Sequence, residues 1–149
     1  MKTYSLKPAD VSRKWYVLDA SKTPLGRLST QAASLLIGKG KPSTSAHIDN
    51  GDFVVVVNAE SLLVTGNKAT AKKYYRHSGF PGGLSERSLT EQMQLDPTKV
   101  IADSIRGMLP VNKLRDGRLK RLKIYAGAEH RHSAQNPQEL SVNRKGKVE

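Results

Sequence analysis

The sequence predicts an α/β domain built on a mostly parallel β-sheet. Segments rich in β-branched and aromatic residues are separated along the chain by segments with helical periodicity, the order expected when helices connect parallel strands. The run Phe53-Val54-Val55-Val56-Val57 is continuously apolar, a pattern typical of a strand that is covered on both faces. With 149 residues, the chain is long enough for one domain with one hydrophobic core.

The first half of the chain predicts an arm, a strand and a helix. Residues 1–14 are polar and are expected to form an N-terminal arm, and residues 15–19 form a short β-rich run. Thr23 is expected to cap a helix over residues 25–37, with Pro24 in its first position. The apolar stripe of this helix consists of Leu25, Leu28, Ala32, Leu35 and Leu36. Gly38, followed by Pro42, is expected to end it.

The second half predicts several shorter elements. Residues 62–65 are expected to form a short strand, residues 72–77 either a strand edge or a loop, and the glycine-rich residues 79–83 a loop. Asp96-Pro97 repeats the pattern of a capping residue followed by proline. The helical face that follows consists of Val100, Ile101, Ser104, Ile105 and Met108. A short helix within residues 111–119 and a last strand at residues 122–125 complete the expected order.

The composition indicates a polyanionic partner. Lys and Arg number 25 against 13 Asp and Glu, which gives a formal net charge of +12. Nucleic acids and anionic membranes are the usual partners of so basic a chain. No stretch approaches the roughly 18 apolar residues of a membrane span, and the basic residues lack an amphipathic aromatic helix beside them. We therefore expect an RNA partner and no membrane.

The sequence contains no pattern for catalysis, a metal or a cofactor. The absence of cysteine removes thiolate zinc sites and cysteine nucleophiles. Residues 38–41 and 65–68 resemble a phosphate-binding loop only superficially, because the required glycine and the final Ser or Thr are missing. His130 and His132 lie two residues apart, but a closed zinc site needs about four ligands. No nucleophile is paired by spacing with a base, so we expect neither enzyme activity nor a small-molecule substrate.

Two clusters of cations have the character of RNA-binding surfaces. Residues 113–123 contain six cations, offset only by Asp116 and interleaved with leucines. One side of this run can pack on the core while the other meets phosphates, although such runs are also common on ordinary solvated helices. Residues 68–77 mix Lys, Arg and His with two tyrosines, and unpaired RNA bases stack on such rings.

An ordered set of short motifs runs through the chain. The set comprises residues 15–20, Leu25-Gly26-Arg27-Leu28, residues 51–59, residues 65–68, Tyr75, His77, Gly79, Gly82-Gly83, residues 107–110, residues 125–130, His132, Ala134, Gln135 and Pro137. Each motif is weak alone. In this order they resemble the large-subunit ribosomal protein L13 family, in its bacterial or organellar branch.

The resemblance implies a three-layer α/β/α domain around a four-stranded parallel sheet, with basic extended termini. The expected parts are an N-terminal arm at residues 1–14, a single α/β domain at residues 15–140 and a basic C-terminal tail at residues 141–149. The family is non-catalytic. The resemblance implies a cytoplasmic structural protein that binds 23S ribosomal RNA and neighbouring large-subunit proteins, and that stabilises the RNA fold early in assembly. A free regulatory protein that binds messenger RNA is the alternative.

The residues expected to face ribosomal RNA combine charge or a flat ring with a position in or beside these motifs. They are Arg27, Lys39, Lys41, His47, Lys68, Lys72, Tyr75, His77, Lys113, Arg115, Arg118, Lys120, Arg121, Lys123, His130, His132 and Gln135.

Overall fold

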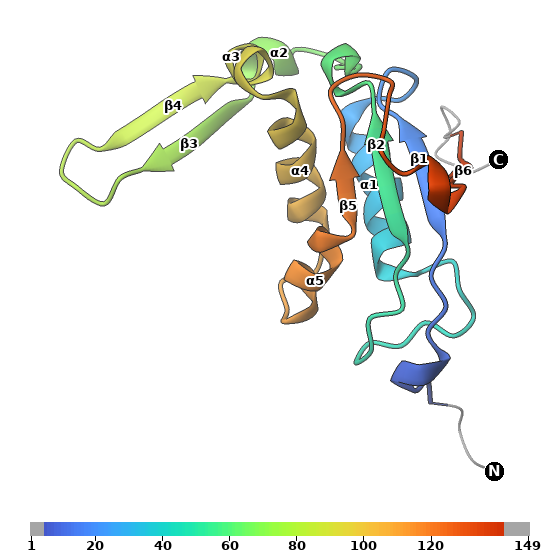
Figure 1. Ribbon diagram of the computed structural model, residues 1–149. Helices are drawn as coiled ribbons and strands as arrows, with labels where there is room; N and C mark the ends of the chain where they lie inside the picture. The colour runs from blue at the N-terminus through green and yellow to red at the C-terminus, as the bar shows by residue number, and fades with distance from the viewer. Residues whose placement is uncertain (1–4, 142–149) are drawn as a thin grey trace.

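The protein is built on one parallel sheet of four strands. The computed structural model describes residues 5–141, so residues 1–4 of the expected arm and residues 142–149 of the expected tail lie outside the described chain. The strands of the sheet are β1 (Trp15–Asp19), β2 (Phe53–Val57), β5 (Leu122–Ile124) and β6 (Gln138–Glu139). Their order is β5-β2-β1-β6, and every neighbouring pair is parallel (Figure 1). The predicted α/β fold with a four-stranded parallel sheet is confirmed.

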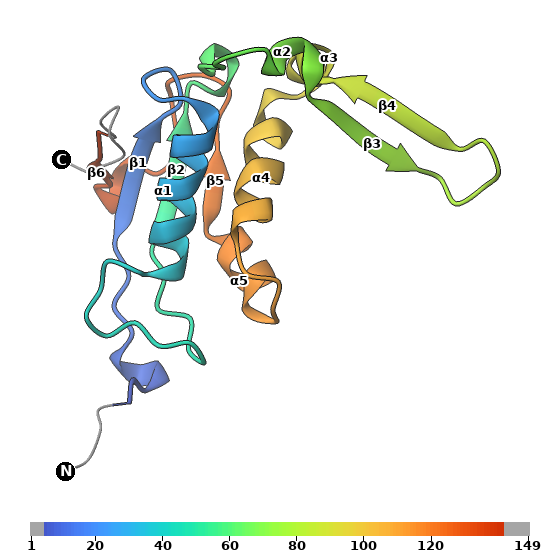
Figure 2. The same cartoon turned by 180° about the vertical axis from the view of Figure 1, so that it is seen from behind.

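The main helices pack together on one face of the sheet. The α-helices of the described chain are α1 (Leu25–Ile37), α2 (Lys68–Ala71), α3 (Leu89–Leu95), α4 (Pro97–Met108) and α5 (Leu114–Lys120), and the short 3-10 turns are η1 (Pro8–Asp10), η2 (Ala59–Ser61) and η3 (Ser133–Gln135). α1 and α4 lie side by side on the face that is turned to the viewer in Figure 2. No helix within residues 5–141 is long and apolar enough to cross a membrane.

The valines of β2 are buried on both faces of the sheet. Val54 and Val56 are fully buried in the main core beneath α1 and α4, together with Leu28 of α1. Val55 and Val57 belong to a second apolar cluster on the opposite face. Burying each such side chain stabilises the fold by about 1.5–3 kcal/mol. The unbroken apolar pattern that predicted this strand therefore reflects cover on both sides.

The start of α1 differs from the prediction although its bounds agree. Pro24, not Thr23, is the capping residue, and no side chain caps the helix. The Thr23 hydroxyl is buried and donates a hydrogen bond of 3.3 Å to the carbonyl of Asp19. The Leu25 N–H, which has no partner inside the helix, donates to the carbonyl of Leu63 at 3.1 Å. The predicted Thr23 cap is therefore wrong, because a neighbouring segment supplies the acceptor instead.

Two other predicted helix boundaries are confirmed. Gly38 ends α1 in the left-handed conformation, with φ 83°, which a residue without a side chain adopts at little cost. At the start of α4, the Asp96 carboxylate accepts hydrogen bonds from the backbone N–H groups of Thr98 and Lys99 at 3.0 and 3.2 Å. Pro97 occupies the first turn, as the sequence pattern predicted.

An antiparallel hairpin projects from the body next to α3 and α4. β3 (Lys73–His77) pairs with β4 (Leu84–Ser88), and the glycine-rich residues 79–83, predicted as a loop, lie in its turn (Figure 1). The sequence analysis predicted neither β4 nor α3, whose capping box joins Ser88 and Glu91. The strand predicted at residues 62–65 is wrong, because Leu63 makes only an isolated bridge in the described chain, to Pro24.

We expect Gly51→Ala to destabilise the fold strongly. A Cβ atom at Gly51 would lie 1.8 Å from the carbonyl oxygen of Leu36, so the backbone of α1 and the entry to β2 would have to separate. Thermal unfolding should show a loss of at least about 3 kcal/mol, the upper range for overpacking in a core. Gly40→Ala is the matched control, because its Cβ would meet nothing within 4 Å. Equal stability of the two variants would contradict this packing.

Candidate nucleic-acid interface

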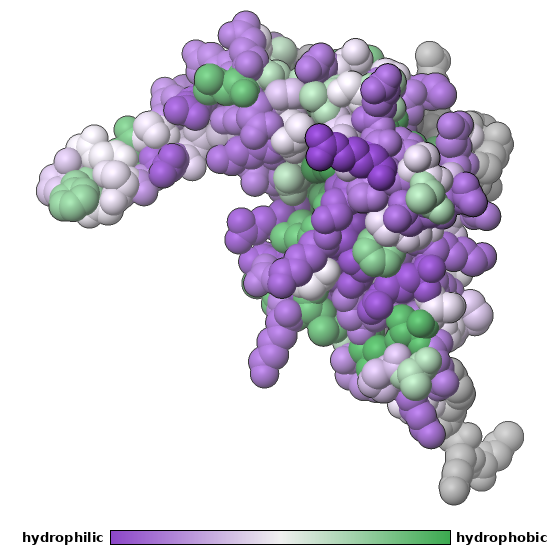
Figure 3. Space-filling model, in the orientation of Figure 1, coloured by the Kyte–Doolittle hydropathy of each residue, from purple (hydrophilic) through white to green (hydrophobic). Residues whose placement is uncertain are grey.

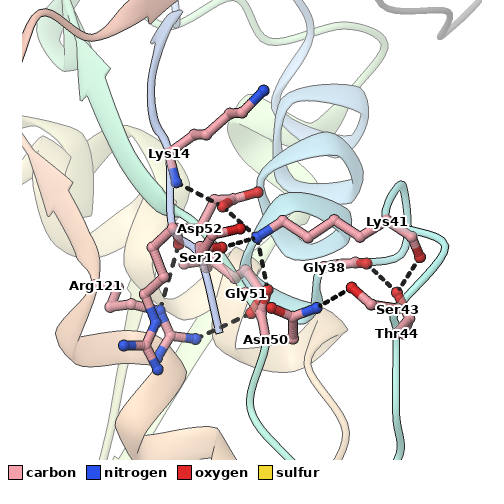
Figure 4. A network of polar contacts seen from close by, with 12 residues as sticks. Ser12, Lys14, Gly38, Lys41, Ser43, Thr44, Asn50, Gly51, Asp52 and Arg121 are labelled. Atoms are coloured by element: carbon pink, nitrogen blue, oxygen red, sulfur yellow. Dashed lines mark hydrogen bonds and ion pairs between the residues drawn. The ribbon is translucent and has the colours of Figure 1, made fainter. Parts of the chain in front are cut away.

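A network of polar contacts ties together the segments that enter the sheet at the amino ends of its strands (Figure 4). The Lys41 ammonium lies 2.6 Å from the Asp52 carboxylate and donates to the carbonyls of Ser12 and Asn50 at 2.7 and 2.9 Å. The backbone N–H of Lys14 donates to the same carboxylate at 2.8 Å. Lys41, expected to face RNA, is therefore engaged inside the protein. We call these contacts the amino-end network, and we include in it the contacts of Asp49 with Arg118 and Arg121 that are described next.

Asp49 binds two arginines that the sequence analysis expected to face RNA. The Arg121 guanidinium contacts both carboxylate oxygens of Asp49, at 2.5 and 2.7 Å, and also donates to the carbonyl of Leu36 at 3.2 Å. The Nε atom of Arg118 lies 3.5 Å from Asp49. Arg118 and Arg121 are only 3% and 7% exposed. The expectation is corrected accordingly: these two cations neutralise a carboxylate within the fold and do not present their charge to solvent.

The cluster sets the ionisation of Asp49. Its partial burial acts to raise the pKa of the carboxyl, but the hydrogen bonds and charge of Arg121, with a smaller contribution from Arg118, outweigh that effect. The pKa of Asp49 is therefore lowered from its ordinary value. Two buried guanidinium groups beside one carboxylate make that carboxylate essential, because an uncompensated buried charge is costly.

The remaining cations of the basic run lie outside the cluster. Lys113, Lys120 and Lys123 are exposed, and Arg115 is half-buried. The six cations of residues 113–123 are thus divided, with two turned inward and four at or near the surface. Lys39 and His47 are likewise exposed, on the loop between α1 and β2.

A second group of cations surrounds a hollow at the opposite end of the sheet. Lys22 and Arg27 come from the segment after β1 and Lys68 from the segment after β2, and together they line a hollow of about 560 Å³. Loops at the carboxyl ends of parallel strands are where α/β folds usually bind ligands. Within residues 5–141 neither Arg27 nor Lys68 makes an ion pair, whereas Lys22 lies 3.5 Å from Asp19. We call this the carboxyl-end hollow.

The hollow brings together two predicted residues and one that the sequence analysis missed. Arg27 and Lys68 are 41 positions apart in the numbering and meet across one surface. Lys72 lines an adjoining concavity that shares Lys68. The sequence analysis did not predict Lys22, although its place soon after the β-rich run at residues 15–19 indicated a cation at the carboxyl edge of the sheet.

The hairpin carries exposed rings along its length. Tyr75 is 64% exposed and His77 is also exposed, while the Nδ1 atom of His77 accepts a hydrogen bond from the Gly79 N–H at 2.9 Å. Phe80 in the turn is 74% exposed and was not predicted. Figure 3 shows the apolar tip of the arm against a largely polar exterior. Exposed rings on a basic arm suit stacking on unpaired bases.

The predicted histidines near the C-terminus lie against aromatic rings. The Tyr125 hydroxyl lies 3.0 Å from Nε2 of His132, whose ring is 4.9 Å from that of Trp15. His130 packs near Tyr125 at 6.5 Å between ring centroids, and Gln135 is exposed. Within the described chain no group of three or more His, Asp or Glu side chains could hold a metal ion.

Comparison with known proteins identifies the family. The sequence matches the family described as Ribosomal protein L13 over residues 13–131. The chain belongs to the ribosomal protein L13 family. It is 54% identical over 142 residues to the large ribosomal subunit protein uL13 of Nitratidesulfovibrio vulgaris, covering 95% of this chain and 99% of the relative. It is 56% identical over 137 residues to the protein of the same name from Mycobacteroides abscessus, covering 92% and 93%.

Membership of the L13 family confirms the resemblance seen in the sequence. Members of this family are structural ribosomal proteins, so the chain is a ribosomal protein and not an enzyme. The cationic surfaces described above are therefore not parts of a catalytic centre.

We expect Asp49→Asn to destabilise this L13 protein by about 3 kcal/mol, because two buried guanidinium groups lose their counter-charge. Urea unfolding at neutral pH measures this change. Asp116→Asn is the matched control, because Asp116 is an exposed carboxylate on α5 and its loss should change stability by less than about 0.5 kcal/mol. Similar values for both variants would contradict the role given to Asp49.

The lowered pKa of Asp49 also predicts how stability depends on pH. Its carboxylate contributes stability above the unfolded pKa, about 3.9, and this contribution is lost as pH falls through the lower folded pKa. Asp19 and Asp96, whose pKa values are also lowered, remain in the variant. Asp49→Asn should therefore show a smaller, but not absent, loss of stability below about pH 4. An unchanged acid profile in the variant would contradict the assignment.

Proposed function

We propose that this protein is a structural constituent of the large ribosomal subunit that binds 23S ribosomal RNA. The observation that carries the proposal is the division of its cations. Lys41, Arg118 and Arg121 at the amino ends of the strands are neutralised by Asp49 and Asp52, whereas Arg27 and Lys68 are exposed at the carboxyl-end hollow without an ion pair in residues 5–141. Unneutralised cations around a hollow attract the phosphates of RNA.

The proposed mechanism is electrostatic anchoring by a rigid body. Arg27 lies in the first turn of α1 and Lys68 begins α2, so both are held by helices and little conformational freedom is lost when they meet phosphates. Each neutralised phosphate releases condensed counterions, which makes binding salt-dependent. The exposed rings of Tyr75 and Phe80 add stacking on unpaired bases. Neutralising phosphates where RNA segments approach would hold the folded RNA during early assembly.

The RNA-facing set in this proposal keeps the predicted residues whose side chains are exposed or half-buried and outside the amino-end network. It contains Arg27, Lys39, His47, Lys68, Lys72, Tyr75, His77, Lys113, Arg115, Lys120, Lys123, His130, His132 and Gln135, with Lys22 added. Lys41, Arg118 and Arg121 are left out because they are bound within the amino-end network. Neighbouring large-subunit proteins are the other partners, and the bacterial relatives favour a cytoplasmic ribosome. No observation favours messenger RNA.

We expect the chain to sediment with the large subunit. Sucrose gradients of a cell lysate at moderate and high salt, probed for this chain, measure its partner directly. Retention at high salt is expected for an integral component, because stacking on its exposed rings adds to the salt-sensitive phosphate contacts. A chain that remains in the soluble fractions at moderate salt would contradict the proposal and favour a free regulatory protein.

Charge reversal at the carboxyl-end hollow should weaken binding to purified 23S ribosomal RNA. For Arg27→Glu with Lys68→Glu we expect at least about a tenfold loss of affinity, and a slope of log K against log salt reduced by about 0.7–0.9 per lost phosphate contact. The control is Lys7→Glu with Arg106→Glu, which reverses two exposed cations outside the proposed set. An equal loss in both double variants would show that net charge alone decides the affinity, and would overturn the hollow as a contact.

A further inference from the structure

A concave pocket lies where the hairpin meets the body. Its lining comes from β3, β4, α3 and α4 and encloses about 180 Å³. Arg76 and Arg87 contribute from the two hairpin strands and Lys99 from α4. None of these three residues belongs to the RNA-facing set above. We call this the hairpin pocket; the elements that line it, β3, β4, α3 and α4, meet where the arm joins the body in Figure 1.

The strand register explains why two arginines line the same pocket. Arg76 is paired with Ser85, and Arg87 is paired with Tyr74. Arg76 and Arg87 therefore lie diagonally across the pair on one face of the hairpin, within reach of each other for long side chains. Two cations within such reach repel each other, and an anion between them would remove the repulsion.

The two faces of the hairpin differ in charge balance. On the other face the diagonal neighbours are Lys73 and Glu86, which form an ion pair of 3.0 Å. On the pocket face the side chains of Arg76, Arg87 and Lys99 make no ion pair within residues 5–141. Asp103 is the one carboxylate of the pocket lining. Three cations against one carboxylate leave the pocket with a net positive charge.

The pocket wall also contains a donor without an acceptor. The Tyr74 hydroxyl is buried and has no hydrogen-bond partner in the described chain. Desolvation by burial, and secondarily the charge of Asp103, raise the pKa of Tyr74, so the hydroxyl keeps its proton at neutral pH. A buried hydroxyl without an acceptor is unfavourable.

We propose that the hairpin pocket binds one backbone phosphate of RNA between Arg87 of the hairpin and Lys99 of α4, with Arg76 as the third cation. The inference rests on the proposed RNA-binding function and specifies a site that the function alone does not. A phosphate supplies the negative charge that would balance the three cations, and its oxygens accept hydrogen bonds from guanidinium groups. Because the cations come from different elements, the phosphate also joins the projecting arm to the body.

The test is a double-mutant cycle across the pocket, measured by binding to purified full-length 23S ribosomal RNA over a range of KCl concentrations. The variants are Arg87→Gln, Lys99→Gln and the two together. If one phosphate is shared, the double variant should lose less affinity than the product of the single losses. Its salt slope should fall by about 0.7–0.9 in total, the value for a single phosphate.

The matched control cycle combines Arg87→Gln with Arg106→Gln. Arg106 is an exposed cation on α4, as Lys99 is, but does not line the pocket. The effects of these two changes should multiply. Multiplied effects for Arg87 and Lys99 as well, with a slope reduced by two phosphates, would overturn the shared site, and so would unchanged affinity in all three pocket variants. Failure of the unaltered protein to bind the RNA would instead overturn the proposed function, and this inference with it.

Discussion

The fold depends on two carboxylates, Asp49 and Asp52, that hold cations at the amino ends of the strands. Asp52 fixes Lys41 and the backbone of Lys14 ahead of β1, and Asp49 fixes Arg121 just before β5. β1, β2 and β5 are therefore joined at their beginnings by contacts to these two carboxylates. Within a partly buried cluster such pairs are screened little by water, so the contacts act as a clamp on the sheet.

Lysine and arginine therefore have two different roles in this protein, one in folding and one in the proposed binding. Lys41, Arg118 and Arg121 at the amino ends serve folding, because Asp49 and Asp52 neutralise their charge within the protein. At the carboxyl-end hollow and in the hairpin pocket, Arg27, Lys68 and Arg87 lie where the described chain supplies no ion-pair partner. The net charge of +12 therefore does not show how unevenly the cations are distributed over the protein. The proposed binding surface lies where the fold leaves cations unpaired, and the strands are joined where it pairs them.

The sequence predicted those features that are set by local physics. The apolar run of β2, the Gly38 terminus of α1 and the Asp96 cap of α4 each depend on a few neighbouring residues, and each is confirmed. Arg118 and Arg121 could not be assigned as reliably, because their burial depends on Asp49, about 70 positions away. Arg118 and Arg121 are three residues apart at the end of α5, which placed both on one helical face. The sequence analysis counted the cations of this run and did not use their spacing.

The hairpin was predicted only in part, with β3 as one of two alternatives, the turn as a loop and β4 not at all, because its residues are selected both for folding and for exposure. An isolated two-stranded hairpin is marginal in water, so this one needs its root against α3 and α4, where Leu89 is buried. Its outer half instead exposes Phe80 and Leu84 at 74% and 61%, which contributes nothing to the stability of the free protein. A strand pattern built for a core would alternate apolar and polar residues, and this one does not. Its order beyond the root is thus expected to depend on whatever covers its rings and neutralises its arginines, which links the conformation of the arm to binding.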